Sequence, residues 1–338
     1  MSIQTTSPAV GREVERSLDL FGTRVRLLAA GPSADGTSAE AALEGVEGML
    51  SEMHDRLTRF DPDSELSALN SSPLESVEGS DFLVLAVQAA VEAAERSGGL
   101  IDPVMIEALA EVGYTNSKAG SQSAPLAEAL ASAPERAPAR ARPDSPWRSI
   151  SVDSDHSMIT RPPGLRMDLG GIGKGLAADL AAARLEGFPT WCADIGGDLR
   201  LGGTAGVDRE VGVTHPLTGE MQITFMLSQG AVATSGISRR VWKAPGNDAF
   251  AHHLLDPSTG LPAWTGVIQA TAVAGSAQEA ETLSKVALLS GPVRGQEILE
   301  GAAGGVLVLD SGEVRACGSL AERVRGGTAA PSANVRPD

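Results

Sequence analysis

Hydrophobic and polar positions follow two different periods along the first third of this chain. Between residues 17 and 30 strand-forming residues dominate, and Gly22 interrupts them, which predicts a strand with a bulge or turn. Apolar positions spaced three and four apart then predict helices over 38–60 and 80–99. Because a glycine pair ends the second helix, we expect the next one, a short helix, to start at Pro103.

Short strand patterns separated by turns fill the rest of the chain. They lie at 148–153, 164–169, 210–216, 221–227, 266–274 and 305–310. Helical patterns at about 174–187 and 277–290 interrupt them. Strands that follow strands, with helices inserted at intervals, predict an α+β fold with largely antiparallel sheets and packed helices.

The same patterns predict how the chain is divided. We expect a single domain over 17–323, a flexible N-terminus over 1–16 and a disordered tail over 324–338. Residues 115–146 are rich in alanine and proline, which indicates an insertion or surface loop with one helical turn in its middle.

Composition and charge narrow the class of protein. A hydrophobic content of 42% excludes wholesale disorder, and a formal net charge of -16 argues against nonspecific nucleic-acid binding. An anionic substrate therefore needs a local positive or metal-bearing site. No apolar run approaches the roughly 20 residues of a membrane span. The N-terminal segment lacks a signal pattern, and two cysteines make no disulfide framework, so we expect a cytoplasmic protein.

The stretch "MDLGGIGKGLAAD" carries the first candidate site. An expected strand ends at Asp168, Gly170, Gly171 and Gly173 follow, and a helix begins near Lys174. Backbone N–H groups at such a helix start can bind a phosphate, and the lysine adds a positive charge. The spacing differs from the G-x-x-x-x-G-K-[ST] pattern, and a tight strand-to-helix turn explains the glycines equally well.

Two further stretches, "ADIGGDLRLGG" and "ATSGISRR", place polar groups beside glycines. A tight turn or a polar loop accounts for either stretch taken alone. The candidate residues in them are Asp194, Gly197, Asp198, Thr234, Ser235 and Gly236.

Two adjacent histidines stand in "AHHLLDPSTG". Successive strand residues point to opposite faces, so only one of His252 and His253 should face a given cleft. A histidine can act as a general base near neutral pH, although a structural role is the alternative.

The late helical stretch "SAQEAETLSKVALLSG" begins with a capping box, in which Ser276 and Glu279 cap each other's backbone. Glu281 and Lys285, four residues apart, share one face of this helix. As a solvated pair they would contribute about 0.3–0.5 kcal/mol. The alternative is that the two residues belong to a site.

Six motifs in a fixed order connect these clusters. The chain from about residue 17 to 317 resembles the FAD:protein FMN transferase family, the ApbE-like flavinyl transferases. The resemblance implies an ApbE-like fold with its site in a central cleft. It also implies a transferase that moves FMN from FAD to a Thr or Ser hydroxyl of an acceptor flavoprotein and releases AMP. The motifs are "RFDPDSELSALN", "DLGGIGKGLAAD", "DIGGDLRLGG", "ATSGISRR", "HHLLDPSTGLPA" and "AETLSKVALLSG".

The resemblance also implies roles for individual residues. His253 would accept the proton of the acceptor hydroxyl, and His252 would matter less. The glycine loop 170–175 with Lys174 would lie against the FAD phosphates. Ser64, Glu65 and Asn70 would support the pocket. The remaining residues implied to bind FAD are Asp168, Asp194, Gly197, Asp198, Thr234, Ser235, Gly236 and His253.

This chain departs from the family at the magnesium site. The resemblance implies a Mg²⁺ held by the backbone carbonyl of Gly173 and by an aspartate and a threonine, whose positions Glu281 and Lys285 occupy here. Glutamate can bind a hard cation, but a lysine ammonium has no lone pair to offer.

Three interpretations follow from this departure. In the first, Glu281 holds Mg²⁺ with fewer ligands, and Lys285 acts on a phosphate as a catalytic group. In the second, the ammonium takes the place of the metal. In the third, metal-assisted transfer is lost.

Two alternative functions remain beside the transferase, namely a noncatalytic FAD-binding relative and an FAD pyrophosphatase that gives FMN and AMP. The sequence contains no Gly-Ala-Thr or Gly-Ala-Ser stretch resembling the family's acceptor motif. We therefore expect the acceptor flavoprotein to be a separate chain.

Overall fold

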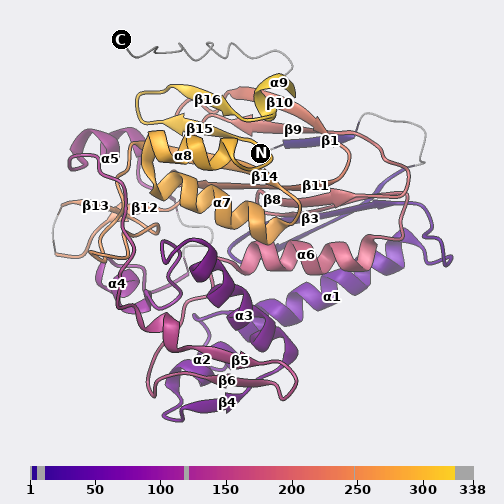
Figure 1. The fold of residues 1–338 in the computed structure, drawn as a ribbon. Helices are drawn as coiled ribbons and strands as arrows, with labels where there is room; N and C mark the ends of the chain where they lie inside the picture. The colour runs from indigo at the N-terminus through magenta and orange to yellow at the C-terminus, as the bar shows by residue number, and fades with distance from the viewer. Residues whose placement is uncertain (1, 6–11, 118–121, 247, 324–338) are drawn as a thin grey trace.

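A central antiparallel sheet organises the computed structural model, which describes residues 2–5, 12–117, 122–246 and 248–323. Its eight strands follow the order β16-β15-β14-β11-β8-β7-β3-β2, and each neighbouring pair is antiparallel (Figure 1). The predicted α+β class with largely antiparallel sheets is confirmed. The strands are β2 Val14–Leu20, β3 Thr23–Ala30, β7 Thr190–Ile195, β8 Asp198–Gly202, β11 Gly230–Gly236, β14 Val267–Ala274, β15 Gly305–Leu309 and β16 Val314–Cys317.

Smaller antiparallel sheets surround the central one. One has the order β1-β9-β10, one has the order β4-β6-β5, and β12 pairs with β13. Their strands are β1 Ser2–Thr5, β4 Ser76–Glu78, β5 Ser151–Asp153, β6 Met158–Thr160, β9 Arg209–Thr214, β10 Met221–Leu227, β12 Val241–Lys243 and β13 Phe250–His252.

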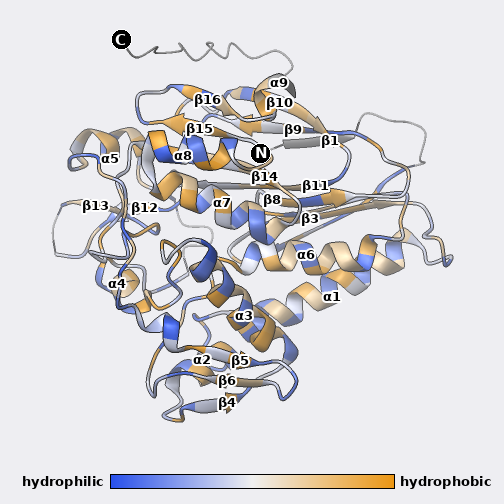
Figure 2. Ribbon diagram, in the orientation of Figure 1, coloured by the Kyte–Doolittle hydropathy of each residue, from blue (hydrophilic) through white to orange (hydrophobic). Residues whose placement is uncertain are grey.

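Most of the helices lie beside or below the central sheet in Figure 1, and the last one lies at the top of the view. They are α1 Ala39–Leu57, α2 Glu65–Ser71, α3 Asp81–Arg96, α4 Ile106–Glu111, α5 Leu126–Ser132, α6 Gly173–Leu185, α7 Ala277–Leu289, α8 Gly291–Glu300 and α9 Leu320–Arg323, with a short 3-10 helix over Pro146–Ser149. Several carry both hydrophobic and hydrophilic residues, as Figure 2 shows for α1, α3 and α7. No helix in the described part of the chain is long and apolar enough to cross a membrane.

The central sheet is buried on both faces. On β3, Leu27 packs into the core formed with α1, α3 and α6, whereas its neighbour Leu28 packs against the β9 and β10 side chains Val211 and Phe225. Alternate strand residues point to opposite faces, so a sheet covered on both sides has strands that are apolar throughout. Strands β7 and β14 are buried along their whole length for this reason.

Serine caps explain where three of the predicted helices begin. The Ser38 side chain accepts a hydrogen bond from an N–H in the first turn of α1, and Ser80 does the same for α3. Ser276 accepts from the Glu279 N–H at 3.2 Å at the start of α7. Each cap satisfies a donor that the first helical turn leaves unpaired.

The predicted strand over 164–169 is wrong. Both backbone groups of Met167 are instead bonded to the side-chain amide of Asn70, at 2.7 Å for the N–H and 2.9 Å for the carbonyl. The Asp168 N–H donates to the carbonyl of Pro103 at 2.8 Å. Because these partners satisfy the backbone, the segment needs no neighbouring strand.

The structure describes parts of the predicted N-terminal segment and of the insertion. Within residues 1–16, Ser2–Thr5 pair with β9 and strand β2 starts at Val14. Within 115–146, helix α5 supplies the expected helical turns and buries Leu126 against the core around β14 and α7. Residues 118–121 and the expected tail over 324–338 lie outside the described residues, and the single domain over 17–323 stays a prediction.

Candidate functional site

A cleft with a volume of about 1110 Å³ lies where the ends of several elements meet. The turn between β2 and β3, the end of α1, the glycine loop before α6, the end of β11 and helix α7 all contribute to its walls. Most of the candidate residues line it, namely Asp168, Gly170, Gly171, Gly173, Lys174, Gly197, Thr234, Ser235, Gly236, His253 and Lys285. The candidates Asp194, Asp198 and Glu281 are buried behind this lining.

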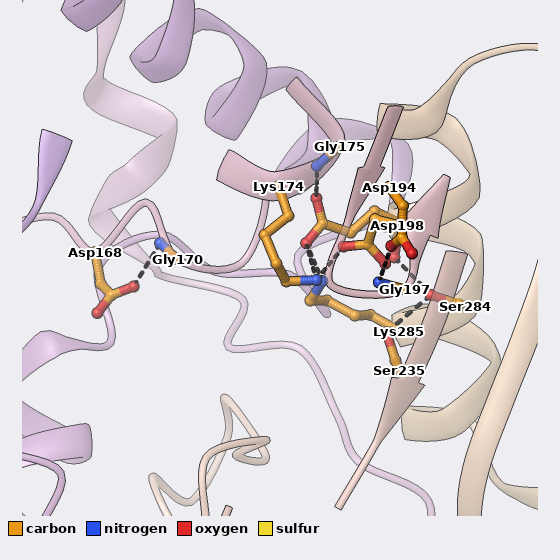
Figure 3. Close-up of polar contacts among 11 residues, drawn as sticks. Asp168, Gly170, Lys174, Gly175, Asp194, Gly197, Asp198, Ser235, Ser284 and Lys285 are labelled. Atoms are coloured by element: carbon orange, nitrogen blue, oxygen red, sulfur yellow. Dashed lines mark hydrogen bonds and ion pairs between the residues drawn. The ribbon is translucent and has the colours of Figure 1, made fainter. Parts of the chain in front are cut away.

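Asp168 holds the glycine loop in place. This carboxylate accepts a hydrogen bond from the Gly170 N–H at 2.8 Å (Figure 3) and forms an ion pair with Arg59. Both Asp168 oxygens are therefore used to fix the loop. The loop leads into α6 at Gly173, so the first turn of that helix faces the cleft.

The turn between β7 and β8 needs glycine for two reasons. Gly196 and Gly197 have φ angles of +65° and +100°, which side chains rarely adopt. A Cβ on Gly196 would also lie 2.1 Å from the Oγ1 of Thr23. Asp194 closes the turn by accepting from the Gly197 N–H at 2.8 Å, and burial raises the pKa of this carboxyl.

Four charged side chains form what we call the charge cluster: Lys174, Asp198, Glu281 and Lys285. Lys285 Nζ donates to Glu281 Oε1 at 2.7 Å, and Lys174 Nζ lies 3.8 Å from the same oxygen. Lys174 also forms an ion pair with Asp198 (Figure 3). The other oxygen of Glu281, Oε2, accepts from the Gly175 N–H at 2.8 Å.

Burial shows that the charge cluster is no surface ion pair. The side chains of Asp198 and Glu281 are each 1% exposed, and those of Lys174 and Lys285 are 20% and 12% exposed. The interpretation of Glu281 and Lys285 as a solvated helix pair is therefore wrong. Both lysines line the cleft, whereas both carboxylates lie behind them.

The pKa values in the charge cluster reflect a competition between burial and neighbouring charges. Burial opposes the charged form of Glu281, but Lys285 and Lys174 outweigh it and lower the pKa of this carboxyl. Burial likewise opposes the Lys174 ammonium, but Asp198 and Glu281 outweigh it and raise its pKa. Burial prevails at the other two, raising the pKa of Asp198 and lowering that of Lys285.

The residues present do not fit a divalent cation at the position that the family resemblance implies. Both Glu281 oxygens already accept hydrogen bonds, and Lys285 offers no lone pair. In the described part of the chain, no group of three or more His, Cys, Asp or Glu side chains could hold a metal ion. Magnesium binding through Gly173 and Glu281 would require the Lys285 ammonium to leave its carboxylate.

The two adjacent histidines lie in different surroundings. His252 is fully buried, with its ring edge-on to Trp264 at 4.7 Å, and burial lowers its pKa to about 3. His253 lines the cleft, and among the described residues its buried Nδ1 has no hydrogen-bond partner. Burial and the Arg240 charge lower its pKa well below the ordinary value. The His253 imidazole is therefore neutral near pH 7.

Hydroxyl groups tie the end of β11 to its neighbours. Thr234 and Thr271 hydrogen-bond through their hydroxyls at 2.9 Å, and Ser235 and Ser284 do so at 2.8 Å. The Ser284 hydroxyl also donates to the Glu281 carbonyl at 3.0 Å. The Ser235 hydroxyl thus holds α7, and with it the charge cluster, against the sheet, whereas Thr234 links β11 to β14.

Helix α2 supports the cleft from another side. Ser64 caps the helix by accepting from the Ser67 N–H at 3.1 Å. Glu65 accepts from the Ser80 N–H and hydroxyl at 2.6 and 2.5 Å, and Asn70 holds Met167, next to the glycine loop. These contacts agree with a supporting role for Ser64, Glu65 and Asn70.

The sequence reasoning missed an aromatic and cationic wall of the cleft. The Arg59 guanidinium lies 4.3 Å from the Phe60 ring centre and 4.9 Å from that of Tyr114, and Arg240 lies 5.9 Å from the Tyr114 ring. Tyr114 also stacks on Trp242 at 5.6 Å. Arg59 and Phe60 open the "RFDPDSELSALN" motif, but no local pattern links them to the chain's single tyrosine.

Comparison with known proteins places this architecture. A family model described as the ApbE family matches residues 21–309. A protein of Treponema pallidum (strain Nichols) named FAD:protein FMN transferase is 28% identical over 339 residues, covering 93% of this chain and 89% of the relative. A Vibrio cholerae protein of the same name is 25% identical over 262 residues, covering 75% of each chain.

Solved structures agree in fold. The ApbE protein from Thermotoga maritima is 25% identical, with a TM-score of 0.76 over 93% of this chain and 100% of that one. The flavin transferase ApbE from Vibrio cholerae is 21% identical, with a TM-score of 0.71 over 92% of this chain and 99% of that one. With a family model that matches most of its length, the chain belongs to the ApbE family.

Proposed function

We propose that this chain is an FAD:protein FMN transferase, which moves FMN from FAD to a Thr or Ser hydroxyl of an acceptor flavoprotein and releases AMP. One observation carries the proposal: a single cleft holds the neutral His253 imidazole and the ammonium groups of Lys174 and Lys285. The names of the relatives support the same activity. A volume of about 1110 Å³ suits a ligand of dinucleotide size.

The reaction needs a base and a site for negative charge. The acceptor hydroxyl oxygen attacks the FMN phosphorus, and the bond from that phosphorus to the bridging oxygen breaks, so AMP leaves with the electron pair. The hydroxyl proton passes to His253, which can accept it because the imidazole is neutral.

Positive charge at the cleft wall supplies the other requirement. Phosphoryl transfer is catalysed mainly by positioning and by neutralising charge on the phosphate oxygens. Lys174 and Lys285 line the cleft, and the buried carboxylates of Asp198 and Glu281 hold them in place. The pyrophosphate of FAD would lie against these ammonium groups and the glycine loop 170–175.

The partner and the compartment belong to the same proposal. The acceptor is a separate flavoprotein, which brings its hydroxyl to the open side of the cleft. The compartment is the cytoplasm, where Cys192 and Cys317, both free and buried, would stay reduced.

An assay of transfer separates this function from its alternatives. The full chain is incubated with FAD and a flavoprotein domain from a transferase-dependent enzyme, and the intact mass of that domain is measured. An FMN-sized mass increase is the expected result. Free FMN and AMP with an unmodified domain would indicate a pyrophosphatase, and unchanged FAD would indicate a binding protein.

A further inference from the structure

We propose that the Lys285 ammonium, held by Glu281, takes the place of a divalent cation, so that this chain binds and positions the FAD pyrophosphate without a metal. The inference rests on the proposed function for the identity of the ligand. It assigns Lys285 a catalytic role, since its ammonium would contact the reacting phosphates.

The carboxylates of the charge cluster already bind ammonium groups. A divalent cation such as Mg²⁺ binds oxygen atoms and prefers six of them. On α7, the Glu281 carboxylate belongs to the charge cluster, and its Oε1 and Oε2 accept from Lys285 at 2.7 Å and from Gly175 at 2.8 Å. The Asp198 carboxylate is bound to Lys174.

The charges of the cluster also disfavour a metal. The charge cluster contains two carboxylates and two ammonium groups, so its formal charge is zero. A divalent cation beside Glu281 would lie next to both ammonium groups in a buried setting, where repulsion is only weakly screened. The cluster is complete without a metal.

The lysines and the carboxylates of the charge cluster lie at different depths. The two lysines line the cleft, and the two carboxylates are buried behind them. An ammonium has three N–H donors, and Glu281 takes one of those on Lys285. The remaining donors are available to phosphate oxygens. The cluster thus presents positive charge to a ligand while its interior stays neutral.

Hydrogen bonds from neighbouring elements hold Glu281 and its helix in place. Ser284, on the same helix, donates to the Glu281 carbonyl at 3.0 Å and bonds Ser235 of β11 at 2.8 Å. The Gly175 N–H binds the Glu281 carboxylate from helix α6. Three elements therefore fix the carboxylate that orients Lys285, as a bound metal would require of its own ligands.

Binding of FAD, measured by quenching of flavin fluorescence, tests this inference independently of transfer. For the full wild-type chain we expect the same Kd within about twofold in chelator and in excess Mg²⁺. We also expect no saturable heat when Mg²⁺ alone is titrated by calorimetry. A Kd at least tenfold weaker in chelator, or saturable Mg²⁺ binding by the free chain, would overturn the proposal.

Variants extend the test. Lys285→Thr should bind FAD at least tenfold more weakly than the wild type in chelator, whereas Lys243→Thr, at an exposed lysine outside the cleft, should not change the Kd. Wild-type-like FAD affinity of Lys285→Thr in chelator would contradict the proposal. If Lys285→Thr fails to fold, Lys285→Arg keeps the charge, and its FAD binding should stay insensitive to chelator.

The outcomes also separate this inference from the proposed function. A wild-type chain that transfers FMN but needs Mg²⁺ to bind FAD would refute the inference and leave the function standing. A chain that binds FAD in chelator but never modifies an acceptor would refute the function and leave the metal-free binding site standing.

Discussion

Replacing Glu281 by glutamine removes one buried negative charge and keeps the size of the side chain. An amide oxygen can still accept from the Gly175 N–H, so the main change is the loss of attraction to two ammonium groups. With an effective dielectric constant of about 20, the attraction is about 6 kcal/mol for Lys285 at 2.7 Å and about 4 kcal/mol for Lys174 at 3.8 Å.

The loss of unfolding free energy is smaller than these attractions, because a lysine left without its carboxylate can release its proton. At pH 7, deprotonating a lysine with an ordinary pKa near 10.4 costs about 4.6 kcal/mol, and burial already lowers the pKa of Lys285. We therefore expect Glu281→Gln to lose about 4 kcal/mol of unfolding free energy, in line with the 3–5 kcal/mol typical of a broken buried pair. The melting temperature should fall by roughly 6 °C for a chain of 338 residues.

Thermal and chemical unfolding measure this loss, and Glu297→Gln is the matched control. Glu297 makes an exposed ion pair with Arg294 at 2.8 Å, so its loss should cost less than about 1 kcal/mol. Because the folded-state pKa of Glu281 is lowered, its stabilisation is complete above about pH 4.3 and is lost as the pH falls further. A loss no larger than that of the control at pH 7 would refute the reasoning.

Three further predictions follow from the site. His253→Ala should keep FAD binding but slow transfer by about 10²–10⁴-fold in a turnover assay, and undiminished turnover would exclude it as the base. In the wild type, the pKa of His252 is about 3, below its unfolded value of about 6.5, so the unfolding free energy decreases as the pH falls below about 6.5, by about 3 kcal/mol at pH 4. His252→Phe should remove this loss of stability in acid. Equal acid sensitivity of variant and wild type in urea titrations would contradict this. Gly196→Ala should lower the unfolding free energy by about 3 kcal/mol, because of its positive φ and its clash with Thr23. Gly197→Ala, whose Cβ meets no atom within 4 Å, should lower it by only about 1–2 kcal/mol. Equal melting temperatures of the two variants would show that the clash is relieved elsewhere.

Local patterns predicted much of the fold. The helices near 38–60, 80–99 and 277–290 begin at serine caps that the sequence displays, and the strand over 221–227 matches β10. Strand β7 was missed because it is buried along its whole length and lacks an alternating pattern. Strand β8 does alternate, but it is short and has glycines at both ends. The stretch around their glycine pair reads as a turn, and only the surrounding sheet shows that the turn joins two strands.

The part of the site that lies on one helix could be predicted from the sequence. The contacts between residues far apart in the chain could not. The four-residue spacing puts Glu281 and Lys285 on one face of a helix. Lys174 and Asp198 reach them from α6 and from the start of β8, contacts that depend on the packing of α6 against the sheet and α7. The wrong strand over 164–169 has a similar cause, because a distant Asn70 amide replaces the partner strand.

The most direct test of the transferase is the ratio of its two products. Purified chain, FAD and an acceptor flavoprotein domain are combined, and acceptor-bound FMN is measured by intact mass while AMP is measured in the same sample. Transfer predicts one AMP for each FMN that becomes covalently attached to the acceptor. AMP that accumulates together with free FMN while the acceptor mass stays unchanged would contradict the proposed function.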